Sequence, residues 1–227
     1  ATQVVGAGPR ALDFGAQPTT YAVELGGGRG IEHLKELKSF TLTGWLNVRI
    51  LDEGGADKFA SAGNRVVSWI LNGKDGVEVV QRADGSLQLG VNEWAEGSPA
   101  RSQPAQLGVP DPKATNAFEN NWRFFAVTYD GTAAAQHVKW YVGNKNADAK
   151  AAGSADYPRG PIGPKPCPVL TVGNAPPGPS RGNGDRMFRG AIDEIRVFGS
   201  SIDGSGALTL EQIIAVQGRP KLEAAKK

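Results

Sequence analysis

Alternation of apolar and polar residues with a period of two is the pattern that most constrains the fold of this chain. In the segment 39–48, apolar side chains fall on one face, and polar side chains with one tryptophan fall on the other. Successive strand residues point to opposite faces of a sheet, so the pattern predicts a half-buried β-strand. The segments predicted to be strands are 10–14, 21–25, 39–48, 65–71, 77–82, 86–93, 122–129, 136–142, 169–173 and 188–198.

Short turn motifs connect several of these segments. Residues 72–76, 83–85 and 130–132 each place Asn-Gly or Asp-Gly between β-branched or aromatic runs. These dipeptides favour the tight turns of β-hairpins, so the strands that they join are expected to be antiparallel. Glycine and proline supply 31 and 15 of the 227 residues, which agrees with many short elements joined by turns.

Two short helices and two long loops interrupt the strand pattern. Residues 31–38 carry an apolar stripe at helical spacing, and residues 209–212 match a capping box that starts a second helix. The stretches 96–119 and 144–168 show no strand pattern, so we expect surface loops there. Together these features predict an all-β fold, a two-sheet antiparallel β-sandwich or jelly roll with one or two short helices.

Composition and charge exclude several classes of protein. The 25 Lys and Arg against 23 Asp and Glu leave a net charge of +2 without a long basic run, so we expect no nucleic-acid partner. No apolar stretch is long enough for a membrane span. The single cysteine, Cys167, rules out an intrachain disulfide and a thiolate metal site. We expect one domain over 1–218, a basic tail over 219–227, and, because the chain begins at Ala1, a processed form or one whose leader has been removed.

Five segments occur in an order and spacing that identify a family: 8–14, 40–45, 121–131, 138–143 and 188–198. With the closing helix pattern over 208–214, the series resembles the laminin-G-like domains of the concanavalin A-like lectin/glucanase superfamily. The resemblance covers almost the whole chain. It implies a two-sheet jelly roll, commonly extracellular, that binds glycans or protein partners or sits beside a catalytic domain. We therefore expect an extracellular, periplasmic or cell-surface location.

Catalytic motifs give little support to an enzyme. The Glu-x-Asp-x-x-Glu motif of related glucanases is absent, and the acidic pairs at 52–53 and 193–194 point to opposite faces of a strand. Residues 178–182 match Gly-x-Ser-x-Gly, but the surrounding prolines indicate a loop instead of a nucleophile elbow. His33 and His137 show no triad or zinc spacing, and we expect both on the surface.

Calcium is the cofactor that the resemblance implies. Members of the superfamily often hold one structural Ca²⁺ through backbone carbonyls near the first strands and a carboxylate from the last strand. Asp193 stands at the matching position in this sequence. The alternative is that Asp193 accepts backbone N–H bonds from a neighbouring loop.

A sugar site needs an exposed aromatic face with polar side chains around it. Trp94 is the first candidate, because it opens a polar loop that includes Glu96; alternatively, it caps the edge of the sandwich. The segment 180–186 concentrates arginine, asparagine and aspartate before the last strand, although it also fits a solvated turn. The candidate ligand-binding residues are Trp94, Tyr21, Arg181, Asn183, Asp185 and Arg186.

The resemblance and these residues predict a non-catalytic binding module of an exported protein, with a glycan or polysaccharide as the first ligand class and calcium as an aid. The second class is a module that binds an extracellular protein or is structural. The third is a lyase or hydrolase with an unrecognised site. Glycan binding predicts that Trp94 or Tyr21 lies exposed beside converging polar groups, whereas a protein interface predicts a wide exposed patch.

Overall fold

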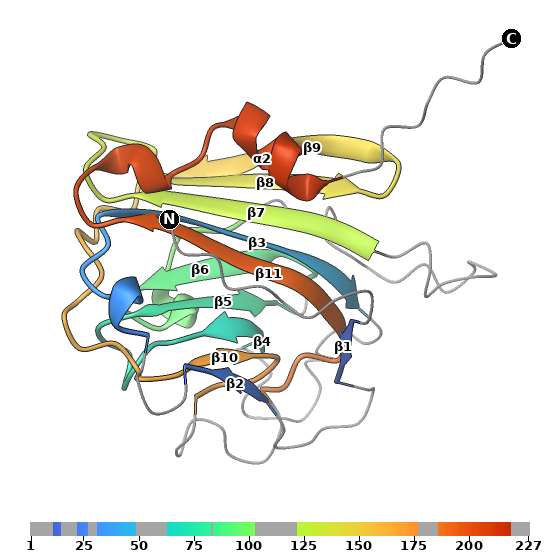
Figure 1. Cartoon of the computed structure of the whole chain (residues 1–227), viewed down its shortest axis with the longest axis horizontal. Helices are drawn as coiled ribbons and strands as arrows, with labels where there is room; N and C mark the ends of the chain where they lie inside the picture. The colour runs from blue at the N-terminus through green and yellow to red at the C-terminus, as the bar shows by residue number, and fades with distance from the viewer. Residues whose placement is uncertain are drawn as a thin grey trace, which may run out of the picture.

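Two antiparallel sheets make up the computed structural model, which describes residues 11–14, 22–26, 31–48, 63–82, 84–102, 122–176 and 186–218 (Figure 1). The six-stranded sheet has the order β1-β11-β3-β7-β8-β9, and the five-stranded sheet has the order β2-β10-β4-β5-β6. The strands are β1 (Leu12–Asp13), β2 (Val23–Leu25), β3 (Ser39–Val48), β4 (Asn64–Ser68), β5 (Val77–Gln81), β6 (Leu87–Val91), β7 (Trp122–Asp130), β8 (Val138–Asn144), β9 (Ala147–Ala155), β10 (Leu170–Val172) and β11 (Gly190–Ser200).

The facing surfaces of the two sheets form one apolar core. Leu42 and Leu46 on β3 share this core with Val79 on β5 and Leu89 on β6. Phe40 meets the ring of Trp69 edge-on, at 6.3 Å between ring centroids. The predicted two-sheet jelly roll is therefore confirmed, and strand β3 has the predicted bounds.

The outer face of β3 is covered as well, which corrects the expectation of a half-buried strand. The 3₁₀ turn η4 (Gly204–Gly206) lies against it, and the Thr41 hydroxyl donates a hydrogen bond to the Gly206 carbonyl at 2.7 Å. Helix α2 (Leu210–Gln217) begins with the predicted capping box at Thr209 and packs Ile213 onto the same sheet (Figure 1). Polar residues of β3 are consequently buried on the side that alternation assigned to solvent.

The predicted first helix is mostly absent, because residues 31–38 form only the 3₁₀ turn η1 (Glu32–Leu34). Glu36 has a φ of 55°, a left-handed conformation that ends any helix here. Leu34 and Leu37 still enter the core, so the apolar stripe reports burial and not helical structure.

The predicted loop 144–168 also requires correction, because its first part is strand β9. Alanine, glycine and serine dominate β9 and have low β-propensity, so pairing with β8 determines its conformation. Beyond β9, the Tyr157 hydroxyl donates to Glu93 Oε1 at 2.7 Å, and the Tyr157 N–H donates to His137 Nδ1 at 3.1 Å. His137 is buried by this contact, contrary to expectation, whereas His33 is exposed as expected.

Two further predictions concern the C-terminal tail and membrane-spanning segments. The predicted basic tail 219–227 lies outside the described residues. Within the described ranges, none of the helices is both long and apolar enough to cross a bilayer.

Candidate functional site

Trp94 follows strand β6 and leads into the 3₁₀ turn η3 (Ala95–Gly97), which folds back over the outer face of the five-stranded sheet. Two glycines make this path possible. A Cβ atom at Gly90 would lie 2.5 Å from the Glu93 carbonyl oxygen, and one at Gly73 would lie 2.5 Å from the indole Nε1 of Trp94. The hairpin glycine therefore also makes room for the indole, which is half-buried.

Beneath Trp94 lies a fully buried ion pair between neighbouring strands. Arg65 on β4 donates from Nε to Glu78 Oε2 at 3.2 Å and from Nη2 to Glu78 Oε1 at 3.4 Å. The guanidinium carbon lies 5.9 Å from the centroid of the Trp94 ring system. Glu78 also accepts a hydrogen bond at 2.7 Å from the backbone N–H of Ala95, which ties η3 to the sheet.

Glu96 joins this pair to a second arginine nearer the surface. Its Oε1 accepts a hydrogen bond from Arg65 Nη2 at 2.7 Å and lies 3.6 Å from Arg186 Nη1. The side chains of Glu96 and Arg186 are 27% and 17% exposed. The Arg186 carbonyl accepts the Arg65 N–H at 2.8 Å, so the backbone sets the distance between the two arginines. We call Trp94, Arg65, Glu78, Glu96 and Arg186 the Trp94 site.

Electrostatics in the Trp94 site follow from burial and pairing. Burial raises the pKa of Glu78, and the Arg65 charge and the Ala95 N–H oppose that rise. Burial alone would lower the pKa of Arg65, but the carboxylates of Glu78 and Glu96 outweigh it and hold the pKa above its ordinary value. Arg65 thus stays charged next to two acidic side chains.

The structure brings two predicted ligand-binding residues together and leaves four unplaced. Trp94 and Arg186 belong to the same site, although the indole and the guanidinium come from segments far apart in the sequence. Tyr21, Arg181, Asn183 and Asp185 lie outside the described residues.

Asp193, the predicted calcium ligand, lies on the other sheet, at an irregularity of β11 where the register with β3 shifts. Its Oδ1 accepts a hydrogen bond from the N–H of Glu194 at 2.8 Å, a partner within the same strand and not a neighbouring loop. Among the residues that the structure places, no three His, Cys, Asp or Glu side chains gather as a metal site. The role of Asp193 as a calcium ligand stays a prediction.

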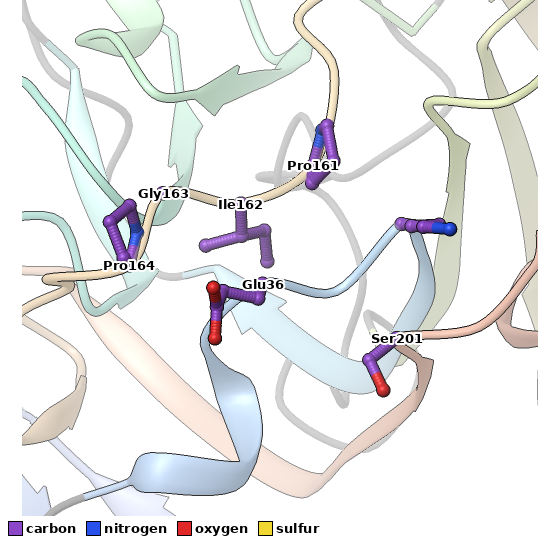
Figure 2. A pocket seen from close by; sticks show the side chains of 7 residues that line it. Glu36, Pro161, Ile162, Gly163, Pro164 and Ser201 are labelled. Atoms are coloured by element: carbon purple, nitrogen blue, oxygen red, sulfur yellow. The ribbon is translucent and has the colours of Figure 1, made fainter.

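A separate pocket of about 520 Å³ lies at the loop end of the sandwich, between residues 36–38, the loop 161–164 and Ser201 (Figure 2). Prolines and Ile162 give it an aliphatic surface, and Glu36 and Lys38 supply the charges. Ile202, which follows Ser201, is 79% exposed. The lining contains no aromatic side chain that would serve as a sugar platform.

The arrangement of the Trp94 site favours binding over catalysis. A glycosidase needs two carboxyl groups that both reach the substrate, one of them as acid. Glu78 is completely enclosed and accepts hydrogen bonds from Arg65 and Ala95, so it has no route to a substrate. What remains partly exposed is the indole, which lies over Arg65, and the Glu96–Arg186 pair that adjoins the same guanidinium.

Sequence reasoning missed Arg65 and Glu78. Glu78 lies in a predicted strand at a position that alternation assigns to solvent. Arg65 instead shares the parity of Val67 and Trp69, which face the core, and a register shift between Arg65 and Val67 puts it beside Glu78. A charged pair on adjacent strands is the only available signal, and it does not tell a buried pair from an exposed one.

Comparisons with known proteins agree with this architecture. Residues 25–206 match a family model of the laminin G type, described as the concanavalin A-like lectin/glucanases superfamily. The CBM40 module of the Ruminococcus gnavus IT-sialidase, also solved bound to α2,6-sialyllactose, superposes with a TM-score of 0.56 at 12% identity, covering 96% of this chain and 98% of that chain. The leech intramolecular trans-sialidase gives a TM-score of 0.58 at 15% identity, covering 96% of this chain and 27% of that chain. A comparison with curated protein sequences finds no match.

Proposed function

The chain belongs to the concanavalin A-like lectin/glucanases superfamily, and from this premise we propose that it is a non-catalytic module that binds a glycan or polysaccharide. The observation that carries the proposal is the half-buried indole of Trp94 over Arg65, whose guanidinium also contacts Glu96, which in turn pairs with the partly exposed Arg186. An indole offers a surface for the apolar C–H side of a sugar ring, and a partly exposed guanidinium can donate hydrogen bonds to its hydroxyls.

Neighbouring structures support the proposal at the level of the fold. The CBM40 module that superposes along nearly its full length is itself a carbohydrate-binding module. Since the identity is 12%, the likeness concerns the scaffold, and the argument for a ligand comes from the residues of the Trp94 site. As part of the same proposal, the protein is exported and meets its ligand outside the cell or at its surface.

A glycan array probed with the purified chain tests this function. We expect binding to at least one glycan class, and Trp94→Ala should weaken it at least about tenfold, equivalent to ~1.4 kcal/mol. Trp45→Ala is the matched control, because Trp45 is also half-buried but lies on the other sheet, against Phe124. A wild-type chain that binds no glycan or polysaccharide would refute the proposal. Binding that is unchanged in Trp94→Ala would show that the glycan binds at another site.

A structural Ca²⁺ held in part by Asp193 is included in the proposal. Its support is the place of Asp193 on β11, which lies between β1 and β3 in the sheet, where the first strands could supply carbonyl oxygens. We expect calcium to raise the melting temperature of the wild type and not that of Asp193→Asn. An identical melting temperature with calcium and with chelator would remove calcium from the proposal.

Binding to a protein is the second candidate function. The observation in its favour is the loop-end pocket, where exposed Ile202 stands beside an aliphatic lining. If this surface carries the function, Ile202→Asp should abolish binding of a partner identified by cross-linking without changing the melting temperature. Loss of glycan binding in the same variant would argue against this assignment.

A further inference from the structure

The arginine at the centre of the Trp94 site has no nitrogen left to offer an anionic ligand. Arg65 Nε and Nη2 donate to Glu78, Nη2 also donates to Glu96, and Nη1 donates to the Gly63 carbonyl at 3.1 Å. The side chain is fully buried, and Trp94 lies over its guanidinium. The planar fork by which arginine binds a carboxylate is thus used inside the protein.

The second arginine shares its carboxylate with the first. Arg186 Nη1 lies 3.6 Å from the same Glu96 oxygen that accepts the hydrogen bond from Arg65. Glu96 is also the more exposed of the two, at 27% against 17%. A ligand carboxylate that approached Arg186 would therefore meet a carboxylate already in place.

The charges of the site balance. Arg65 and Arg186 stand against Glu78 and Glu96, and Glu78 accepts three hydrogen bonds, from the two Arg65 nitrogens and the Ala95 N–H, as an ionised carboxylate does.

From this balance we propose that the Trp94 site selects an uncharged glycan and that Glu96 excludes acidic sugars. The inference rests on the proposed function and names its ligand class. Sugar hydroxyls carry no charge, so they can accept from Arg186 while Glu96 Oε1 keeps its two arginines and Glu96 Oε2 stays enclosed. Sialic and uronic acids, by contrast, bring a second negative charge to a site whose cations are already paired.

Glu96→Gln is the variant that separates charge from shape. Glutamine has nearly the same size and keeps an oxygen for Arg65, but it removes the negative charge beside Arg186. We expect the variant to gain at least about tenfold in affinity for acidic glycans relative to the wild type. Glu211→Gln, an equal charge change at the exposed start of α2, is the control and should leave the ligand preference unchanged.

The test uses an array of matched pairs, each a neutral oligosaccharide and the same chain ending in sialic or uronic acid, lactose and α2,6-sialyllactose among them. We expect the wild type to bind neutral members at least as tightly as their acidic partners, with affinity unchanged between low and high salt. Salt screens charge pairs at a surface and leaves a neutral ligand unaffected. The salt arm needs no variant, so the proposal stays testable even if Glu96→Gln fails to fold.

Three results would overturn the inference in distinguishable ways. Preference of the wild type for the acidic members, with binding that weakens as salt rises, refutes the neutral-ligand assignment while leaving glycan binding intact. A folded Glu96→Gln variant without gain for acidic glycans refutes the role of Glu96. Absence of binding to every glycan refutes the proposed function itself and the inference with it.

Discussion

Removal of one charge from the buried Arg65–Glu78 pair gives the sharpest test of the structure. In Glu78→Gln the guanidinium stays enclosed and loses the ionised partner that meets both Nε and Nη2. Leaving one charge of a buried pair without its partner costs about 3 to 5 kcal/mol, and because Arg65 keeps its 2.7 Å contact with Glu96 we expect the lower end, about 3 kcal/mol. A domain of ordinary stability has about 5 to 15 kcal/mol in total, so this change removes a large share of it.

Urea unfolding followed by tryptophan fluorescence measures this loss. With a slope of about 2.5 kcal/mol/M, the expected loss shifts the midpoint by roughly 1 M. The matched control is Glu32→Gln, which breaks the Lys35–Glu32 pair, where Nζ and Oε2 lie 2.5 Å apart but the side chains are 39% and 72% exposed. Water screens an exposed pair, which therefore contributes little, so the control should barely move the midpoint.

The comparison of these two variants can also refute the description of the buried ion pair. If Glu78→Gln costs no more than Glu32→Gln, then Glu78 is not enclosed against Arg65. The description of the Trp94 site, including the covering of Arg65 by the indole, would then be wrong.

Three further outcomes follow from burial, capping and close packing. Burial raises the pKa of Tyr129 to about 12, against about 10 in an unfolded chain. The contribution of Tyr129 to stability is therefore present below pH ~10 and is lost as the pH rises through about 12. Melting temperatures of the wild type and of Tyr129→Phe from pH 9 to 12 check this, and an equal dependence of melting temperature on pH in both proteins would contradict it. Thr209→Ala removes the capping box of α2 and should cost about 1 kcal/mol in urea unfolding, while an unchanged midpoint would show that the cap adds nothing. Gly143→Ala places a Cβ 2.6 Å from Gln217 Nε2 and should loosen α2 at a cost of about 1 to 3 kcal/mol; faster amide exchange in α2 would support this, and unchanged exchange would refute it.

Local pattern was sufficient for most strands and for the last helix. Strand β3 has the predicted bounds, and the capping box at Thr209 forms as expected, because both depend on residues close in the chain. Strand β9 could not be predicted, since its alanines acquire strand conformation by pairing with β8. The left-handed conformation of Glu36 likewise ends the predicted helix, and the local sequence does not predict it.

The candidate site divides in the same way. Sequence alone marked Trp94 and Arg186 as residues able to bind a ligand, because indole and guanidinium chemistry is visible in any context. That the two belong to one site was decided by the fold of η3 over the sheet and by the backbone contact between Arg65 and Arg186.

By itself, the sequence determined the strand alternation, the antiparallel hairpins and the family, since these depend on side-chain type and near neighbours along the chain. Only the tertiary structure decided which polar residues are buried. Glu78 carries the pattern of an exposed strand residue, and Arg65 meets it only because the register shifts between Arg65 and Val67. The two become an enclosed ion pair because a later segment lies over them. Burial depends on what covers a residue, and the covering segment need not be its neighbour in sequence.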